Sequence, residues 1–415
     1  MINAFYDSFR ILNKVYGEGA YFKQALSSTD IEEKNRAFTT KLCYGVLDKD
    51  IELSYAIKYL APKTPKAAIR LVLKIAMYAF KYLQKKPYAV ADAAVELVKK
   101  MGKGGASGFV NAFLRKYFVA EIPLPEEEQE RISVKYSYPL FIVKQIIAEY
   151  GTERAEKIFA AGNGKTCLVF YETDGEEYLQ DLGKEYEKTP FENVFLVKNF
   201  VRNSDYDSGV YTYQALPSAA ICDLVEPCEK LLDCCAAPGG KSVRLSYKCE
   251  SVTSFDIHPH RVELINAYIA RMKRKNITAE VWDSTIFKTE LKESFDAVLC
   301  DVPCSGTGVI GDDPDIKLNR TEENVRELNE IQRAILSAAA GYVKKGGCLY
   351  YSTCSILKCE NEDVVNAFLA EHKDFTIERV NSPLPHEDKG GANAFLPDIS
   401  GGLGFFAAKM KRRAE

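Results

Sequence analysis

From about residue 210 onward, the sequence alternates short apolar, strand-like runs with longer stretches of helical character. The strand-like runs are KLLDCC, SVTSFDI, ITAEVWD, FDAVLCD and GCLYYST. Alternation of this kind predicts a parallel sheet with helices on both faces. Ligands bind such sheets outside the carboxyl ends of the strands. The pattern therefore predicts an α/β fold and also the edge of the sheet at which a site would lie.

The amino-terminal part has a different pattern, because its apolar residues recur at helical spacing. In AAIRLVLKIAMYAFKYL the i, i+3, i+4, i+7 positions form one apolar helix face. These positions are Ile69, Val72, Leu73, Ala76, Met77, Phe80 and Leu83. We expect Thr29 to cap another helix, since Glu32 follows it as in a capping box. Helices are also predicted in VADAAVELVKKM and GFVNAFLRKYF, so this part is all-helical.

The segment EIPLPEEEQE interrupts the helical pattern with two prolines and a run of acids. It is typical of an interdomain linker or of a new helix N-terminus. Beyond it a helical stretch, LFIVKQIIAEYG, is mixed with strand-like runs such as TCLVFY and NVFLVKN. We therefore expect three parts: an all-α domain over residues 1–125, a small α+β subdomain over 126–208 and an α/β Rossmann-like domain over 209–415.

Composition limits the partners. The net charge of −3 and the pI near 6.0 argue against a generally basic nucleic-acid coat, so RNA contacts would come from local patches. The sequence has neither a secretory signal nor an apolar stretch long enough to span a membrane, and we expect a cytoplasmic monomer without membrane or DNA partners. The 12 cysteines are scattered, which favours free thiols over disulfides and predicts no metal site.

The stretch LLDCCAAPGGKSVRL predicts a strand, a tight turn of small residues and a helix start. It is neither a dinucleotide fingerprint nor a P-loop, which disfavours a pyrophosphate cofactor. Four predicted strands end in an acid: Asp233, Asp256, Asp283 and Asp301. Such acids suit ribose hydroxyls, an adenine amine and a positive charge. Adenosine, a carboxylate and a cation together describe S-adenosylmethionine.

Two cysteines follow predicted strand ends, Cys304 in DVPCSGTG and Cys354 in YYSTCSILKCENE. Both should lie at the ligand-binding edge of the sheet, whereas most free cysteines are inert packing residues. The packing interpretation is kept for Cys43, Cys167, Cys222 and Cys348.

A thiol beside an acid suits methylation of cytosine at carbon 5, which is a poor nucleophile. A thiolate that adds to carbon 6, with a proton or hydrogen bond supplied at ring nitrogen 3, makes carbon 5 reactive toward a sulfonium methyl. The carbon-5 proton must then leave and the thiolate must be expelled. This chemistry needs one thiol, one carboxylic acid and one group that assists release.

Several motifs closely resemble the RNA cytosine-5 methyltransferases of the Sun/Fmu/Nol class. They are DCCAAPGGK, FDAVLCDVPCSGTGVI, DPDIK, YYSTCSILKCENE and GFFAAKMK. The amino-terminal stretches resemble the NusB-like RNA-binding domain that bacterial small-subunit ribosomal RNA enzymes of this class carry: NRAFTTKLCYGVLDKDIE, PYAVADAAVELVKKMG and GFVNAFLRKY. The segments CLVFYET, QALPS and GGLGFF depart from the usual family pattern, outside the catalytic loops.

The resemblance implies a role for each matched residue. The loop that would hold the methionine part of S-adenosylmethionine consists of Cys235, Ala236, Ala237, Pro238, Gly239, Gly240 and Lys241. Asp256 would bind the ribose and Asp283 the adenine, and Asp301 would lie near the reacting centre. Cys354 would be the nucleophile, and Cys304 would assist release of the methylated base. The implied substrate is a cytosine in small-subunit (16S) ribosomal RNA.

Basic clusters are weaker RNA-contact candidates. RMKRKN, with Arg271, Lys273, Arg274 and Lys275, and KMKRR near the end are more often solvated faces and tails. Arg115 and Lys116, beside aromatics in FLRKYF, are better candidates.

Three alternatives stay open. The chain could be a non-catalytic RNA-binding or ribosome assembly factor, or it could methylate cytosine in another RNA. Within the enzyme interpretation, Cys304 could be the nucleophile, as the Pro-Cys thiol is in DNA cytosine-5 methyltransferases.

Overall fold

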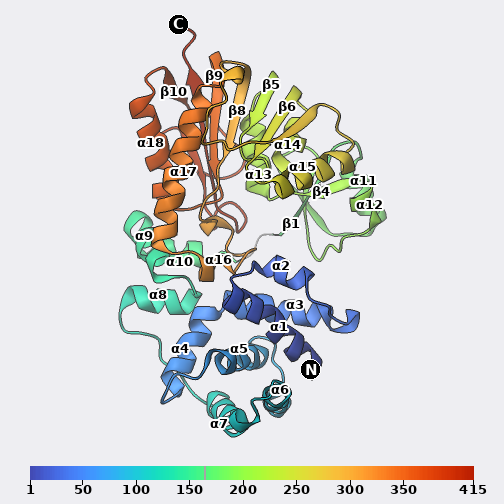
Figure 1. Ribbon diagram of the computed structural model, residues 1–415, viewed down its shortest axis with the longest axis vertical. Coiled ribbons are helices and arrows are strands. Elements are labelled where there is room, and N and C mark those ends of the chain that lie inside the picture. The colour runs from blue at the N-terminus through green and yellow to red at the C-terminus, as the bar shows by residue number, and fades with distance from the viewer. Residues whose placement is uncertain (163–164) are drawn as a thin grey trace. The chain divides into compact units, whose positions relative to one another are not determined.

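The structure is a computed structural model that describes residues 1–162 and 165–415 (Figure 1). Asn163 and Gly164, which fall inside the predicted α+β subdomain, lie outside the described residues. The chain divides into two compact units. The first comprises residues 1–159 and 313–320, and the second comprises residues 160–312 and 321–415.

The first unit is helical. Its helices are α1 (Ile2–Glu18), α2 (Phe22–Ser27), α3 (Glu33–Asp48), α4 (Asp50–Leu60), α5 (Ala67–Lys81), α6 (Pro87–Lys100), α7 (Ser107–Tyr117), α8 (Glu128–Tyr136), α9 (Leu140–Tyr150), α10 (Thr152–Ala160) and α16 (Ile316–Asn319), with a 3₁₀ turn η1 (Gly104–Ala106). The helix predicted in AAIRLVLKIAMYAFKYL is α5. Residues outside the predicted apolar face of this helix are buried as well. Even Lys74 of α5 is buried, where it pairs with the Asp50 carboxylate and lies over the Tyr16 ring.

One helix start was predicted wrongly. Helix α3 begins at Glu33 after Glu32, and no side chain caps it. The Thr29 hydroxyl instead donates to the Ala25 carbonyl of α2 at 2.8 Å, so the preceding helix uses the residue that the sequence pattern assigned to the next one. By contrast, the acidic run after the two prolines does start a helix, because the Glu127 carboxylate accepts a hydrogen bond from the Glu130 amide at the start of α8.

The compact units divide the chain differently from the predicted domain limits. Residues 128–159 belong to the helical unit, in which the Ser137 hydroxyl after α8 accepts a hydrogen bond from the Ile51 amide of α4. Residues 313–320, which contain the DPDIK motif, also belong to it. Their Lys317 ammonium, with a 1% exposed side chain, contacts the carboxylate and carbonyl of Asp48 at 2.8 Å. Neither contact can be read from a linear pattern.

The second unit starts with a small antiparallel sheet of order β2-β3-β1-β4. Its elements are β1 (Thr166–Phe170), α11 (Gly175–Asp181), β2 (Tyr186–Lys188), β3 (Val194–Val197), α12 (Ser204–Asp207) and β4 (Tyr211–Tyr213). Aromatic residues fill its core: Phe170, Phe195 and Tyr211 are buried, and the Phe170 ring packs in a T-shaped arrangement with Phe195 and tilted against Tyr211.

A nine-stranded sheet forms the rest of the second unit, with the order β11-β12-β13-β9-β8-β5-β6-β7 and with β10 paired to β13. Its strands are β5 (Cys228–Asp233), β6 (Cys249–Asp256), β7 (Ile277–Val281), β8 (Phe295–Asp301), β9 (Val343–Thr353), β10 (Phe375–Glu378), β11 (Glu387–Lys389), β12 (Ala392–Phe395) and β13 (Phe405–Arg412). Strands β5 to β9 pair in parallel, as predicted, and β13 joins β9 in antiparallel fashion.

Helices cover both faces of this sheet (Figure 1). They are α13 (Leu216–Leu224), α14 (Gly240–Leu245), α15 (Pro259–Arg271), α17 (Glu322–Ala340) and α18 (Glu362–Glu371). Alternate strand residues face opposite sides, so Leu231 packs in one core with α13 and α14, whereas Leu232 packs in another with α17 and α18. The predicted fold class, an all-helical domain followed by a Rossmann-like α/β domain, is confirmed. Among the described residues, no helix is both long and apolar enough to cross a membrane.

Candidate active site

The loop after β5 has the tight turn predicted from its small residues. Gly239 has a φ of 109°, a left-handed conformation that favours glycine, and α14 begins at the next residue. Asp233 ends β5 but turns inward, where its carboxylate accepts a hydrogen bond from the Ser242 hydroxyl at 2.6 Å. Burial raises the pKa of Asp233 to about 6. Asp233 therefore stabilises the loop through its buried hydrogen bond to Ser242, at the start of α14.

A cavity of about 630 Å³ lies at the carboxyl ends of the parallel strands. Its lining includes seven of the predicted site residues: Cys235, Ala237, Asp256, Asp283, Asp301, Cys304 and Cys354. The other loop candidates, Ala236, Pro238, Gly239, Gly240 and Lys241, are not part of this lining. One hollow thus contains both the predicted cofactor acids and the two predicted reactive thiols.

Asp301, the last residue of β8, is held from two sides. One carboxylate oxygen lies 2.5 Å from the Lys241 ammonium, and the other accepts a hydrogen bond from the Ser352 hydroxyl at 2.7 Å. Burial alone would lower the pKa of Lys241, but the neighbouring acidic groups, Asp301 foremost, together outweigh burial and hold that pKa above its usual value. Lys241 is therefore a buried cation that contacts the site through Asp301.

The two thiols lie side by side, although 50 residues separate them in the chain. The Sγ atoms of Cys304 and Cys354 are 3.2 Å apart. The Gly308 amide also donates to the Cys354 carbonyl at 2.9 Å, so the loops after β8 and β9 are bonded to each other. The hydrogen bond with Cys354, together with burial, raises the pKa of Cys304 well above the usual thiol value.

The cavity wall also contains residues that were not among the predicted site residues: Ile257, His258, Arg261, Trp282, Ser284, Thr285, Ile331 and Ile335. Most of them adjoin a strand-end acid. Arg261, for example, pairs with Asp256 at 3.5 Å, and the Thr285 hydroxyl donates to Asp283 at 2.7 Å. Most of these wall residues could have been predicted from the sequence, because they lie close to an acid at the end of a predicted strand.

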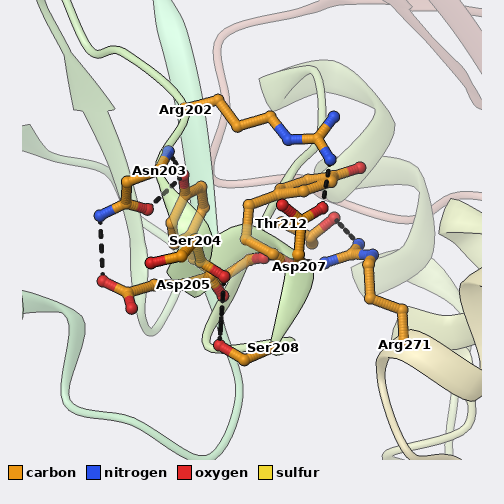
Figure 2. Close-up of polar contacts among 10 residues, drawn as sticks. Arg202, Asn203, Ser204, Asp205, Asp207, Ser208, Thr212 and Arg271 are labelled. Carbon is orange, nitrogen blue, oxygen red and sulfur yellow. Dashed lines mark hydrogen bonds and ion pairs between the residues drawn. The ribbon is translucent and has the colours of Figure 1, made fainter.

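Among the basic residues considered as RNA contacts, Arg271 forms its hydrogen bonds within the second unit. Figure 2 shows its guanidinium at Thr212, to whose hydroxyl it donates at 2.9 Å. It also donates to the carbonyls of Tyr206 and Tyr211. Arg274 likewise donates to the carbonyl and hydroxyl of Ser246. These arginines join α15 to neighbouring segments, which leaves Lys273 and Lys275 as the exposed cations of the cluster.

The KMKRR stretch is neither a tail nor an exposed basic patch, because its first four residues belong to β13. The Lys409 side chain is 1% exposed and contacts Glu226 at 2.7 Å and Glu378 at 2.6 Å. Arg412 pairs with Asp374 at 3.0 Å. Arg115 and Lys116 are exposed on α7, and Lys116 donates to the Leu60 carbonyl.

The donor set of the cavity fits S-adenosylmethionine. Three strand-end carboxylates suit ribose hydroxyls, an adenine amine and a positive charge, and the small Cys235 and Ala237 leave room beside them. Within residues 1–162 and 165–415, no group of three or more His, Cys, Asp or Glu residues is arranged to hold a metal ion. The buried positions of Cys43, Cys167, Cys222 and Cys348 agree with the packing role predicted for them.

Comparison with known families matches both parts of the chain. Residues 222–411 match the family described as 16S rRNA methyltransferase RsmB/F, and residues 7–118 match the NusB family. The probable ribosomal RNA small subunit methyltransferase B of Bacillus subtilis is 34% identical to the chain, over 94% of each protein. The chain belongs to this methyltransferase family.

Other comparisons agree with that membership. The ribosomal RNA small subunit methyltransferase B of Sodalis glossinidius is 28% identical over 93% of this chain and 92% of its own. The crystal structure of PH0851 has the same fold, with a TM-score of 0.83 and 23% identity over 99% of this chain and 98% of that one. The family resemblance and the S-adenosylmethionine cofactor predicted from the sequence are both confirmed.

Proposed function

We propose that this methyltransferase forms 5-methylcytosine in small-subunit ribosomal RNA through a covalent bond between Cys354 and carbon 6 of the base. The observation that carries the proposal is the meeting of two thiols, 3.2 Å apart, beside Asp301 in the wall of the cofactor cavity. Methyl transfer to an oxygen or an exocyclic nitrogen requires no thiol, whereas carbon-5 methylation requires an added nucleophile. The ribosomal substrate is supported by the names of the family and of the relatives.

Cys354 is the proposed nucleophile. Its sulfur adds to carbon 6 as the thiolate, and the electron pair of the ring then makes carbon 5 nucleophilic. Bound S-adenosylmethionine supplies the electrophilic methyl group. The neighbouring Cys304 has a raised pKa and so keeps its proton, which it can donate to the Cys354 sulfur. A thiol that keeps its proton is a poor nucleophile, which favours Cys354 over Cys304 as the attacking thiol.

Asp301 is proposed to protonate ring nitrogen 3 of the cytosine, and Lys241 to balance the charge of Asp301. As electrons move toward the ring during the addition, nitrogen 3 gains negative charge and needs a proton or a hydrogen bond. Asp301 can deliver its own carboxyl proton, while the Lys241 ammonium, 2.5 Å away, keeps all of its protons. Lys241 then balances the carboxylate charge that remains.

Cys304 is proposed to act in the release step. Once carbon 5 carries the methyl group, its proton must leave before the bond between sulfur and carbon 6 can break. In the adduct the Cys354 sulfur is bonded to carbon 6 and no longer carries a charge beside Cys304. The Cys304 thiol can then release its own proton to solvent and, as a thiolate, accept the carbon-5 proton. Asp301 takes back the proton on nitrogen 3, and the free Cys354 thiolate and 5-methylcytosine are the products of this step.

The helical domain is proposed to bind the RNA. Residues 1–125 contain 20 Lys and Arg against 11 Asp and Glu, whereas the whole chain has 55 against 58. The positive charge is therefore concentrated in the NusB-like part, as RNA phosphates require. Arg115 and Lys116 on α7 are candidate contacts there.

The proposal is tested with small-subunit RNA from cells that lack this protein. The purified chain, labelled S-adenosylmethionine and this RNA should give 5-methylcytidine after digestion, and bisulfite mapping should locate one or a few positions. Labelling of another RNA alone would change the substrate. A chain that binds the cofactor yet labels no RNA would favour an assembly factor.

The roles of the two thiols are tested by trapping. Cys304→Ala should accumulate an RNA adduct that survives denaturing electrophoresis, because release is slowed. Cys354→Ala should form no adduct. The reverse pattern would make Cys304 the nucleophile.

A further inference from the structure

The side chain of Glu360 is the centre of a buried hydrogen-bond network next to the two thiols. Glu360 ends the 3₁₀ turn η4 (Lys358–Glu360) and is 0% exposed. It does not line the cofactor cavity. Burying a carboxylate costs free energy unless hydrogen-bond donors surround it. The donors around Glu360 therefore indicate which parts of the site this side chain holds in place.

Both carboxylate oxygens of Glu360 have two partners. Oε1 accepts hydrogen bonds from the Ser305 amide at 2.8 Å and from Gln332 Nε2 at 3.0 Å. Oε2 lies 2.5 Å from the hydroxyls of both Ser305 and Ser355. An ionised carboxylate only accepts hydrogen bonds, and here every contact comes from a donor.

The two serines follow the two thiols directly in sequence, Ser305 after Cys304 and Ser355 after Cys354. A single oxygen atom of Glu360 therefore binds equivalent positions of the loop after β8 and the loop after β9. The two serine hydroxyls are 3.3 Å apart, similar to the 3.2 Å between the two sulfurs. This shared contact fixes the distance between the two loops at the thiols.

The two loops depend on Glu360 to different degrees. The Cys354 loop has anchors of its own, since the Ser355 carbonyl accepts from Asn361 Nδ2 at 3.0 Å and the Ser355 amide donates to the Thr353 hydroxyl at 3.2 Å. The two residues that flank Cys304 bond Glu360 and its partner: the Ser305 amide bonds Glu360, and the Pro303 carbonyl accepts from Gln332 at 3.0 Å. The bonds of this loop to the Cys354 loop lie further along, at Thr307 and Gly308.

We propose that Glu360 is a positioning residue that holds Cys304 against Cys354, and that its loss impairs release of the methylated base more than formation of the adduct. The inference rests on the proposed function, in which Cys354 attacks and Cys304 acts in release. The negative charge of Glu360 also contributes to the raised pKa of Cys304, after the hydrogen bond to Cys354 and burial.

The test compares Glu360→Ala with Glu360→Gln in adduct trapping and in single-turnover methyl transfer. With both thiols present, Glu360→Ala should accumulate adduct as Cys304→Ala does, and turnover should fall by about a hundredfold. Glu360→Gln should restore release to within about tenfold of the wild type, because the amide oxygen can accept from Ser305 and Gln332 while the amide nitrogen donates to the serine hydroxyls. Cofactor binding, measured by calorimetry, should not change in either variant.

Two serine variants keep the test decisive if Glu360→Ala does not fold. Ser305→Ala and Ser355→Ala each remove one hydroxyl from the same Glu360 oxygen. Ser305→Ala should slow release and accumulate adduct, whereas Ser355→Ala should have a smaller effect on release, because the backbone of Ser355 keeps its bonds to Asn361 and Thr353.

The controls separate this inference from the proposed function. If Cys304→Ala itself forms no adduct, both proposals fail. If Cys304→Ala forms adduct but Glu360→Ala, with normal cofactor binding, does not, the role of Glu360 alone is overturned. Equal losses in every step for both serine variants would also overturn it, because they would indicate general destabilisation.

Discussion

Two pairs of neighbouring thiols lie at opposite ends of the same sheet. The Sγ atoms of Cys304 and Cys354 are 3.2 Å apart at the carboxyl ends of β8 and β9. Those of Cys228 and Cys249 are 3.4 Å apart at the amino ends of β5 and β6, where the two residues pair in the ladder. The first pair lines the cofactor cavity and the second does not.

Thiol acidity alone would select the wrong pair. The Cys228 thiol donates to Cys249, and this hydrogen bond lowers the pKa of Cys249 to about 7 despite partial burial. Cys249 is therefore shifted toward the thiolate, yet it has neither a strand-end acid nor a cofactor cavity beside it. The polarity of a parallel sheet, which gathers loops and ligands at the carboxyl ends, distinguishes a reactive thiol pair from a packed one.

The largest expected effect comes from removing one thiol of each pair. Cys354→Ala should lower methyl transfer by about 10⁴-fold or more, because the proposed nucleophile is lost. Cys249→Ala, which removes the thiol of lowered pKa at the other end of the sheet, should stay within about twofold of the wild type once the folded fraction is matched. Labelled methyl transfer to small-subunit RNA measures both. Comparable losses of methyl transfer in the two variants would mean that the thiols at the carboxyl end of the sheet are not specifically the reactive ones.

The same contrast exists within one strand, since β8 contains an aspartate near each end. Asp301 pairs with Lys241 at 2.5 Å, and Asp296 pairs with Lys344 at 2.6 Å. Asp301→Asn should lower turnover by about a thousandfold, as the loss of an acid-base group does. Asp296→Asn should leave turnover unchanged. Steady-state kinetics at saturating cofactor separates the two, and an Asp301→Asn enzyme with normal turnover would remove Asp301 from the mechanism.

The lysine partners should give a smaller contrast. Lys241→Met should lower turnover by about a hundredfold, because Asp301 then lacks the cation that balances its charge. Lys344→Met should have no effect on turnover. The measurement is kcat for both variants with the same RNA. If Lys241→Met raised only the cofactor KM, Lys241 would act in cofactor binding instead.

The carboxyl end of the sheet was the part most readable from sequence, for a physical reason. Strands of alternating or continuous apolar residues and the acids that follow them are local features, and parallel pairing then brings their ends together. Asp256, Asp283 and Asp301 were found in this way. Cys304 and Cys354 were recognised because each follows such a strand within a family motif.

Features that depend on tertiary partners were missed. Strands β10 to β13 are short or rich in charge, and Lys409 is buried only because Glu226 and Glu378 meet it there. Lys317 is part of the helical unit because its ammonium forms an ion pair with Asp48. The network of Glu360 combines residues from three separate segments. None of these pairings leaves a periodic signal in the chain.

The smallest expected effect concerns stability at the amino end of the sheet. Partial burial would raise the pKa of Asp296, but hydrogen bonds from Lys344 and the Lys230 amide outweigh it and hold the pKa below its usual value. Ionised Asp296 therefore stabilises the fold above the pKa of the unfolded chain, near 3.9. Since the pair is partly exposed, Asp296→Asn should lower the free energy of unfolding by only about 0.5 kcal/mol at pH 7.

The pH dependence of that difference tests its origin. Urea unfolding of the wild type and of Asp296→Asn should show the difference at pH 7 and lose it as the pH falls below about 4, through the lowered pKa of the folded protein. The wild-type carboxylate becomes protonated there, whereas asparagine does not titrate. Lys344→Met, which removes the other member of the pair, should show the same trend. A difference that did not change with pH would mean that the bond to the Lys230 amide, rather than the charge, is what Asp296 contributes. In either case methyl transfer should be unaffected, because this carboxylate lies at the end of β8 away from the cofactor cavity.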